Sequence, residues 1–257
     1  MPKLTQERYH ELLAYRNEGL RKVGTRLIDD IERPKARCFY PTVWHRSRHT
    51  NYPALALGPI RVAPVGPTLI VAEEAIAALD HAKVLDVGCA AGRFRDYLRL
   101  RRPKREIEYV GMDAAPPAVD FPVYRSLADV SDRDFDMILM SEVAEHMPAD
   151  VFADEYLRLF PAMLKASGVL VVSVPNPLAP AILHRDVTHV QHYPWYDLYA
   201  MLRFFFDDVD VVRTHFVSSA RRLLSLPMRR VLSYFLEVDW CEGIVLLARK
   251  PRLDEMP

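Results

Sequence analysis

This chain of 257 residues has few glycines, few cysteines and no formal net charge. It has 9 glycines and 3 cysteines, and its 34 Lys and Arg residues are balanced by 34 Asp and Glu, so that the formal net charge is zero. This balance excludes the uniformly basic surface expected of a general nucleic-acid binder. Because the glycines are so few, we expect each of them where the backbone needs its conformational freedom.

The three cysteines, Cys38, Cys89 and Cys241, are far apart and form no CxxC pair. An odd number of scattered thiols is typical of a protein whose cysteines stay reduced, as in the cytoplasm. The first residues lack the apolar core of a secretory signal, and the most apolar stretch, 168–183, is shorter than a membrane span and contains three prolines. We therefore expect a soluble, cytoplasmic protein.

The hydrophobic pattern divides the chain into two regions. Apolar residues recur at near-helical spacing over 4–31, which predicts a helix there. Residues 34–67 are rich in Pro, His, Arg and aromatic side chains and are predicted to be irregular. We therefore expect an N-terminal helix and cap segment, 1–67, followed by a main domain, 68–257.

Short apolar runs alternate with helical patterns in the main domain. Strands are predicted at 83–89, 107–113, 121–125, 135–141, 168–176, 209–216 and 242–250. Helices are predicted at 68–79, 92–101, 150–165 and 193–202, the first with Thr68 as its N-cap. The alternation indicates the α/β class, an open sheet with helices on both faces. A helical insertion, 218–239, separates the last two strands.

A turn of small residues joins the first predicted strand to the helix that follows it, in VLDVGCAAGRF (84–94). Gly88 permits a tight turn, Ala90 lets a ligand lie against the backbone, and Gly92 opens the helix. The pattern is similar to the turn that binds the pyrophosphate of dinucleotides at a helix N-terminus.

Two acidic residues narrow the choice of cofactor. Asp86 ends the strand inside the turn, where it would repel a phosphate, so a cofactor with a cationic amino group fits better. Asp113 ends the next strand, where a carboxylate can accept hydrogen bonds from both hydroxyls of a ribose.

With these features the chain from Thr68 to Lys250 resembles the class I S-adenosylmethionine-dependent methyltransferases. The resemblance rests on VLDVGCAAGRF, on GMD at 111–113 and on LKASGVLVVSVPN at 164–176. It implies a Rossmann-like, seven-stranded sheet with an antiparallel last strand, and S-adenosylmethionine as cofactor. The alternative, a nicotinamide-dependent dehydrogenase, is disfavoured by the acid in the turn and by the lack of a second glycine-rich half.

The predicted cofactor pocket combines the turn with three later segments. We expect it to be lined by Asp86, Gly88, Cys89, Ala90, Gly92, Asp113, Ser126, Leu127 and Ser141. The resemblance places Ser126 and Leu127 near the adenine. Ala90 stands where the family more often has glycine, a mild departure.

A candidate metal site follows the fourth predicted strand, in SEVAEHM (141–147). Glu142, Glu145 and His146 are spaced i, i+3 and i+4, so one helical turn would present all three on one face, where they could hold Mg²⁺ or Zn²⁺. The run resembles the E-x-x-E-H segment of ubiquinone-biosynthesis O-methyltransferases, which use a divalent metal. In many class I enzymes without a metal, the same Glu and His only hold the cofactor loop together, and this alternative stays open.

A candidate general base follows the fifth predicted strand, in HRDVTHVQHYPWYDL (184–198). Asp186 could orient an imidazole, and His189 or His192 could then take the proton of an acceptor hydroxyl, with His146 as the next candidate. The segment resembles D-x-T-H-V runs of small-molecule and glycan O-methyltransferases. Alternatively, Asp186 and His189 only cap the entry of a helix.

Arginines gather in two further places. In the cap segment, Arg46, Arg48 or Arg61 could hold the methionine carboxylate or an anionic substrate, although a solvated basic loop is the simpler interpretation. In the insertion 218–239, two arginine pairs flank apolar residues, and Pro227 should break the segment into two short helices. This segment could contact a membrane interface, or it could pack on the sheet edge as a wall of the substrate pocket.

Together these features predict an enzyme that methylates a hydroxyl of a small molecule or glycan, with a His base or metal assistance. No nucleic-acid partner is expected, and the N-terminal helix could pair two copies into a homodimer. The second candidate is an RNA or protein methyltransferase. The zero net charge and the absence of an appended RNA-binding module disfavour RNA, and Ser141–Ala144 replaces the N-P-P-[YFW] motif of amino-base methylation. A non-catalytic, methyltransferase-like binding protein is disfavoured by the intact cofactor turn.

Overall fold

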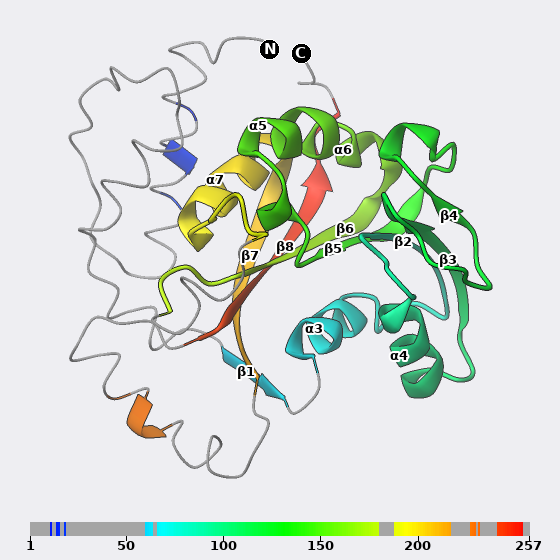
Figure 1. Cartoon of the computed structure of the whole chain (residues 1–257), viewed down its shortest axis with the longest axis horizontal. Coiled ribbons are helices and arrows are strands. Elements are labelled where there is room, and N and C mark those ends of the chain that lie inside the picture. Colours follow the sequence, from blue (N-terminus) through cyan, green and yellow to red (C-terminus); the bar gives the residue numbers. More distant parts are fainter. Residues whose placement is uncertain are drawn as a thin grey trace.

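An eight-stranded sheet organises the part of the chain that the computed structural model describes, namely residues 11, 14–15, 18, 60–63, 66–179, 188–216, 227–229, 231 and 241–253 (Figure 1). The strand order is β1-β7-β8-β6-β5-β2-β3-β4. The strands are β1 (Ile60–Ala63), β2 (His81–Val87), β3 (Glu106–Met112), β4 (Val123–Tyr124), β5 (Phe135–Ser141), β6 (Leu164–Pro175), β7 (Phe206–Phe216) and β8 (Gly243–Pro251).

The seven predicted strands are all found, as β2 to β8, with ends shifted by a few residues. β8 pairs antiparallel with both β6 and β7, whereas every other pair in the sheet is parallel. The α/β, Rossmann-like class and the antiparallel last strand are therefore confirmed. One expectation is wrong: residues 34–67 are not irregular throughout, because Ile60–Ala63 pairs in parallel with β7 as an eighth strand at the edge.

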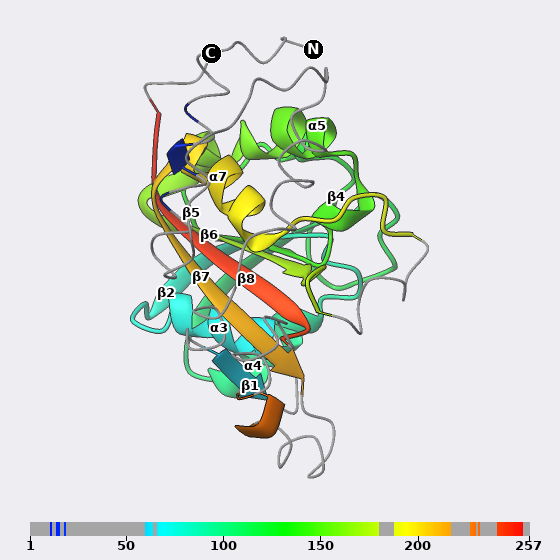
Figure 2. The same cartoon turned by 90° about the vertical axis from the view of Figure 1, so that its left-hand side faces the viewer.

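Helices cover both faces of the sheet. They are α3 (Pro67–Ala75), α4 (Arg93–Arg101), α5 (Ala149–Val151), α6 (Phe160–Met163) and α7 (Trp195–Phe205), with short 3-10 turns η2 (Leu127–Asp129) and η3 (Ala144–His146). Figure 1 shows α5, α6 and α7 on one face and α3 and α4 on the other, and Figure 2 shows α5 and α7 opposite α3 and α4 from the side. The N-cap of α3 is Gly66 rather than the predicted Thr68, since the helix already begins at Pro67, a residue suited to the first turn.

The predicted helix 150–165 is broken. A π-helical stretch, η4 (Phe152–Leu157), separates α5 from α6, and the N–H of Arg158 donates to the carbonyl of Ala153 at 3.2 Å. Pro161 lies in the first turn of α6, where its missing N–H does no harm, but it prevents one continuous helix through this point. The strand β6 then starts at Leu164, four residues earlier than predicted.

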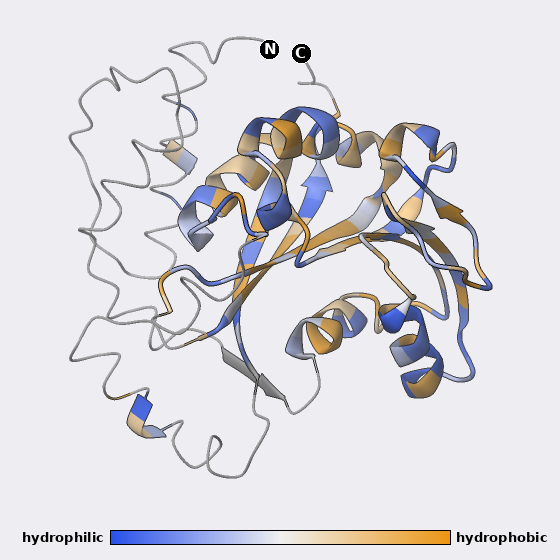
Figure 3. Cartoon of the chain, viewed as in Figure 1, coloured by the Kyte–Doolittle hydropathy of each residue, from blue (hydrophilic) through white to orange (hydrophobic). Residues whose placement is uncertain are grey.

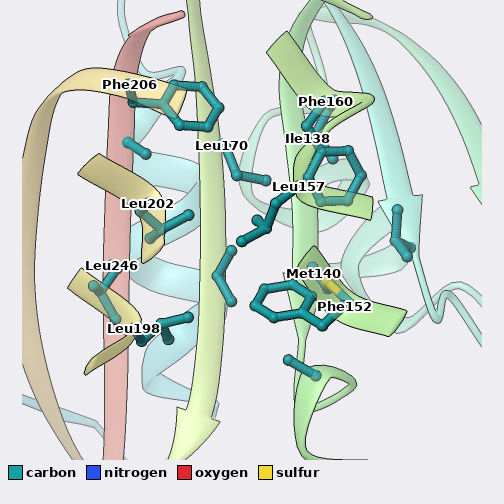
Figure 4. Packing of buried hydrophobic residues seen from close by; sticks show 14 of the residues in the cluster. Ile138, Met140, Phe152, Leu157, Phe160, Leu170, Leu198, Leu202, Phe206 and Leu246 are labelled. Atoms are coloured by element: carbon teal, nitrogen blue, oxygen red, sulfur yellow. The ribbon is translucent and has the colours of Figure 1, made fainter. Parts of the chain in front are cut away.

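Two hydrophobic cores hold these layers together, and β5 contributes to both because it is buried on both faces. Ile138 and Met140 pack in the larger core with α7, whereas Met137 and Leu139 pack in the smaller core beneath α3 and α4. Figure 4 shows the larger core, where side chains of α7 meet those of the sheet and of the η4–α6 region. Apolar side chains therefore line the central strands, as expected for buried parallel strands, while polar residues gather on the outer helix surfaces (Figure 3).

The described residues of the N-terminal segment are helical and contact α7 and the end of β8. Glu18 accepts a hydrogen bond from Tyr199 at 3.1 Å and pairs with Arg203 at 3.2 Å, and Tyr15 contacts Arg252. The rest of the predicted helix 4–31 lies outside the described residues. Within the described residues, no helix is both long and apolar enough to cross a membrane.

Candidate functional site

The turn between β2 and α4 is fixed by backbone hydrogen bonds to the neighbouring strand. The N–H groups of Gly88 and Cys89 both donate to the carbonyl of Met112, at 2.7 and 3.2 Å, and the N–H of Gly92 donates to the carbonyl of Cys89 at 2.8 Å. Gly88 and Gly92 have φ of 76° and 81°, and Ala90 between them has φ of 43°. Two glycines therefore occupy left-handed positions that other residues rarely adopt, and Gly92 is the N-cap of α4, so that it opens the helix as predicted.

The close packing around the turn also requires glycine at positions 88 and 92. A Cβ on Gly88 would lie 2.2 Å from a methyl group of Val143, and a Cβ on Gly92 would lie 2.6 Å from the ring of Phe121. The same ring would be 2.8 Å from a Cβ on Gly111. The turn is therefore packed on one side against the loop after β5 and on the other against Phe121.

Asp113 lies at the carboxyl end of β3 and ties the turn to the next loop. Its two carboxylate oxygens each accept a backbone hydrogen bond at 2.9 Å, one from Ala90 and one from Ala115. A carboxylate has about four acceptor positions, so these two bonds leave capacity for the hydroxyls of a ribose. The side chain is half-buried and faces the turn; that it binds a ribose stays a prediction.

Asp86 is buried beneath the turn, with 5% of its surface exposed, and it accepts a hydrogen bond from the hydroxyl of Tyr109. Loss of hydration raises the pKa of its carboxyl to about 7; the Tyr109 hydrogen bond opposes this rise and the nearby Asp113 adds to it. Among the described residues, neither Asp86 nor Asp113 has a basic partner. Two carboxylates without a counter-charge fit a cofactor that carries positive charge and a ribose, as S-adenosylmethionine does.

The remaining predicted cofactor residues have partners of their own. Ser126 donates a hydrogen bond to Asp129 at 2.8 Å, and Leu127 is buried in the larger core. The hydroxyl of Ser141 lies 3.0 Å from that of Ser173 on β6. Burial raises the pKa of the Cys89 thiol to about 12, so this side chain stays neutral. That these residues line the pocket stays a prediction.

The structure does not place Glu142, Glu145 and His146 on one helical face. The only turn of helix here is η3, which starts at Ala144, and Glu142 lies before it with φ of 56°. The Ser173 hydroxyl donates to the Glu142 carboxylate at 2.9 Å, and burial of this carboxylate raises its pKa. The single helical face predicted for the three residues is therefore not formed, because the i, i+3, i+4 rule applies only within a helix. That Glu142 binds a metal stays a prediction.

Glu145 and His146 instead come together with a histidine from the segment after β6. Single ligating atoms of Glu145, His146 and His189 all lie within 4.8 Å of one another. The rings of His146 and His189 meet edge to face at 4.8 Å, and those of His189 and His192 at 6.4 Å. Glu145 is buried, His189 and His192 are half-buried, and His146 is exposed. We call His146, His189 and His192 the histidine cluster.

Backbone contacts fix the two segments of this cluster relative to each other. The carbonyl of Glu145 accepts hydrogen bonds from the N–H groups of Val190 and Gln191, at 2.9 and 3.1 Å. Nδ1 of His146 lies 3.3 Å from the carbonyl oxygen of Thr188 and 3.1 Å from its hydroxyl. A bond to that carbonyl needs the proton on Nδ1, which leaves a lone pair on Nε2 for a proton or a metal.

Several predicted residues lie outside the described residues. Asp186, Arg46 and Arg48 are among them, and so is the side chain of Arg61, whose backbone belongs to β1. In the insertion 218–239 the structure describes only 227–229 and 231, which are helical. The roles given to these residues stay predictions.

Two further residues at the site, Tyr109 and Phe121, are not predicted from the sequence. Both flank the cofactor turn: Tyr109 bonds to Asp86, and its ring packs edge to face on Phe121 at 5.1 Å. Side chains alternate between the two faces of a strand, so Tyr109 and Gly111 share one face of β3. Because Gly111 pairs with Asp86 on β2, this alternation could have indicated that Tyr109 lies near Asp86.

A glycine turn between β2 and α4, an acid at the end of β3 and one antiparallel strand in an otherwise parallel sheet define a class I S-adenosylmethionine-dependent methyltransferase. The sequence model of the family described as "Methyltransferase domain" matches residues 13–216, and the chain belongs to this family. No curated protein matches the chain in sequence.

Solved structures of methyltransferases are similar in fold. A SAM-dependent methyltransferase from Archaeoglobus fulgidus has 18% identity and a TM-score of 0.51, with 71% of this chain and 94% of that chain covered. The N-methyltransferase NodS from Bradyrhizobium japonicum WM9 has 15% identity and a TM-score of 0.48, over 72% and 94% of the two chains. A TehB-like SAM-dependent methyltransferase from Corynebacterium glutamicum has 18% identity and a TM-score of 0.45, over 82% and 96%. At such identities the first likeness shows the fold alone.

Proposed function

We propose that this methyltransferase acts on a hydroxyl group of a small molecule or glycan that binds against the histidine cluster. The observation that carries the proposal is the direct packing of this cluster's loop on the cofactor turn. Val143 abuts Gly88, and the N–H of His146 donates to the carbonyl of Val143 at 3.0 Å. Imidazoles that can accept a proton therefore lie one short turn away from the predicted cofactor pocket.

Bound S-adenosylmethionine supplies a methyl group on a positively charged sulfur, ready for in-line displacement. The chain's own residues have two tasks. The first is to hold the cofactor, with Asp113 on the ribose and Asp86 near the positive charge, because positioning supplies much of the acceleration in such a transfer. The second is to take the proton of the acceptor hydroxyl, for which His189 is the best placed base.

The surroundings of His189 suit a base. Its ring packs edge to face between His146 and His192, and Glu145 lies beside it as a buried carboxylate. The exposed His146 offers a route by which the proton of the acceptor hydroxyl can reach solvent.

A second candidate gives the same three residues a metal. One carboxylate and two imidazoles are a donor set for a borderline divalent ion such as Zn²⁺ rather than for Mg²⁺, which prefers oxygen ligands. Glu145, His146 and His189 would hold the ion, which would lower the pKa of a coordinated acceptor hydroxyl. In this case His192 would be the base.

The test compares histidine variants with labelled S-adenosylmethionine and a panel of hydroxyl-bearing sugars and phenols. His189→Ala should lose about 100-fold or more in turnover while cofactor affinity is kept. His81→Ala at the exposed start of β2 is the matched control and should keep full activity. Full rates in both His189→Ala and His192→Ala would contradict the proposal, as would methylation of amines but not of hydroxyls.

The metal candidate is tested separately by metal analysis of the purified protein and by chelation. If the ion is required, chelation removes activity, Zn²⁺ restores it, and Glu145→Gln loses both metal and activity. If chelated protein keeps full activity, the base mechanism without metal stands.

A further inference from the structure

A buried acid and a buried tyrosine form a pair beneath the cofactor turn. Asp86 and Tyr109 have 5% and 6% of their surfaces exposed, and they lie on the neighbouring strands β2 and β3. The Tyr109 hydroxyl donates its hydrogen bond to the Asp86 carboxylate. The mechanism of methyl transfer uses the charge of Asp86 but gives no role to this tyrosine.

The Tyr109 ring is held in place by a chain of contacts that ends at the surface. It meets Phe121 edge to face, with ring planes at 88°, and the guanidinium of Arg95 lies 4.9 Å over the Phe121 ring. Arg95 is in turn held by Asp120, with its second nitrogen at 3.0 Å. These contacts hold the tyrosine ring in the orientation in which its hydroxyl donates to Asp86.

No basic side chain of the described residues neutralises Asp86. The titratable groups that face it are the Tyr109 hydroxyl from β3, the Asp113 carboxylate directly after β3, and the Cys89 thiol from the turn. Arg95 on α4 is directed to Asp120 and Phe121. Burial and Asp113 both favour the protonated form of Asp86, and the Tyr109 hydrogen bond favours the charged form, so that the pKa of Asp86 is about 7.

We propose that Asp86 carries a proton in the free protein and releases it when the cationic cofactor binds, and that Tyr109 sets the pH at which this exchange occurs. The proton leaves the carboxyl oxygen of Asp86 for the solvent, and the carboxylate that remains faces the positive charge of the ligand. Tyr109 is a positioning residue, since it acts through Asp86. The inference rests on the cofactor site described above and adds a pH dependence to it.

The experiment is calorimetric titration of the full chain with S-adenosylhomocysteine, which carries the same amino group as the cofactor and is stable. Titrations in buffers of different ionisation enthalpy count the protons released between pH 5.5 and 7.5, where the ligand's amino group, which lies beside its own carboxylate, stays protonated. Wild-type protein should release close to one proton per site at pH 5.5 and fewer toward pH 7.5. Its affinity should rise by up to about tenfold per pH unit at the acid end.

Three variants distinguish the proposed effect of Tyr109 on the protonation of Asp86 from a merely structural role of the tyrosine. Tyr109→Phe keeps the ring but removes the donor, which raises the pKa of Asp86, so its proton release should extend to higher pH and its affinity at pH 7 should fall. Asp86→Asn should bind with no proton release and no pH dependence in this range. Tyr97→Phe, on α4, is the matched control and should superimpose on wild type.

The outcomes distinguish the proposed proton exchange at Asp86 from the cofactor site itself. Binding without proton release in the wild type, or a Tyr109→Phe profile identical to wild type, would overturn the proposal while leaving the cofactor site intact. No binding by the wild type at any pH would overturn the cofactor site as well. If Tyr109→Phe does not fold, the wild-type proton count and Asp86→Asn still give the answer.

Discussion

Replacing Gly88 by alanine tests the contact between the cofactor turn and the loop that leads to the histidine cluster. Gly88 has φ of 76°, and a Cβ placed on it would lie 2.2 Å from Cγ2 of Val143, with the Val143 Cβ at 3.4 Å. A separation of 2.2 Å is far inside van der Waals contact, so one of the two loops must move. The β-branched Val143 has few other side-chain conformations with which to avoid the new methyl group.

The expected cost has two parts. A left-handed backbone costs a non-glycine residue about 1–2 kcal/mol. Overpacking of a tight contact costs typically about 1–3 kcal/mol. Gly88→Ala should therefore lower the free energy of unfolding by about 2–5 kcal/mol, and it should weaken S-adenosylhomocysteine binding because the turn is displaced.

Chemical denaturation of a double-mutant cycle measures the steric part alone. Val143→Ala removes the methyl group that the new Cβ meets, so the double variant should be more stable than the sum of the single changes predicts, by about 1–3 kcal/mol. The backbone cost remains in both Gly88→Ala proteins and cancels from this difference. Additive effects would refute the reasoning, since they would mean that the two loops do not touch at this point.

Two further predictions concern the acids of the site. Asp113→Ala should weaken S-adenosylhomocysteine binding by orders of magnitude in calorimetry, because hydrogen bonds to a charged group contribute about 1.5–3 kcal/mol each; near-wild-type affinity would contradict the ribose assignment. The pKa of Asp86 is about 7 in the folded protein against 3.8 ordinarily, so its proton stabilises the fold fully below pH 4, and this stabilisation is lost as the pH rises to 7. The stability of ligand-free wild type relative to Asp86→Asn should therefore fall between pH 4 and 7 and stay level above pH 8; a constant difference would refute the burial argument.

The sequence predicts the centre of the sheet well because the signals there are local. β5 is a run of buried apolar residues, and β2 ends in a turn whose glycines are demanded by the backbone at that point. Such features depend on near neighbours in the chain, so they can be interpreted without knowledge of the fold. The edge strand β1 has no such signal: it lies in a proline-rich segment and forms by pairing with β7, about 150 residues later.

The candidate site could be predicted only in part, because some of its residues are brought together by contacts between segments that are far apart in the sequence. The sequence does predict that Gly88 and Asp113 follow strands and that Gly92 opens a helix, because these features are local. Glu142, Glu145 and His146 do not share a helical face as their spacing predicts, because the helical turn begins only at Ala144. The approach of His189 to Glu145 depends on backbone bonds between segments more than 40 residues apart, and residue spacing gives no indication of it.

The central claim is that the turn after β2 and Asp113 hold the cofactor next to the histidine cluster. A crystal structure with S-adenosylhomocysteine tests it most directly. We expect the ribose hydroxyls within hydrogen-bond distance of the Asp113 carboxylate, the amino group on the side of Asp86, and the sulfur directed toward His189. A ligand bound away from the turn, or one whose sulfur faces away from His146, His189 and His192, would contradict it.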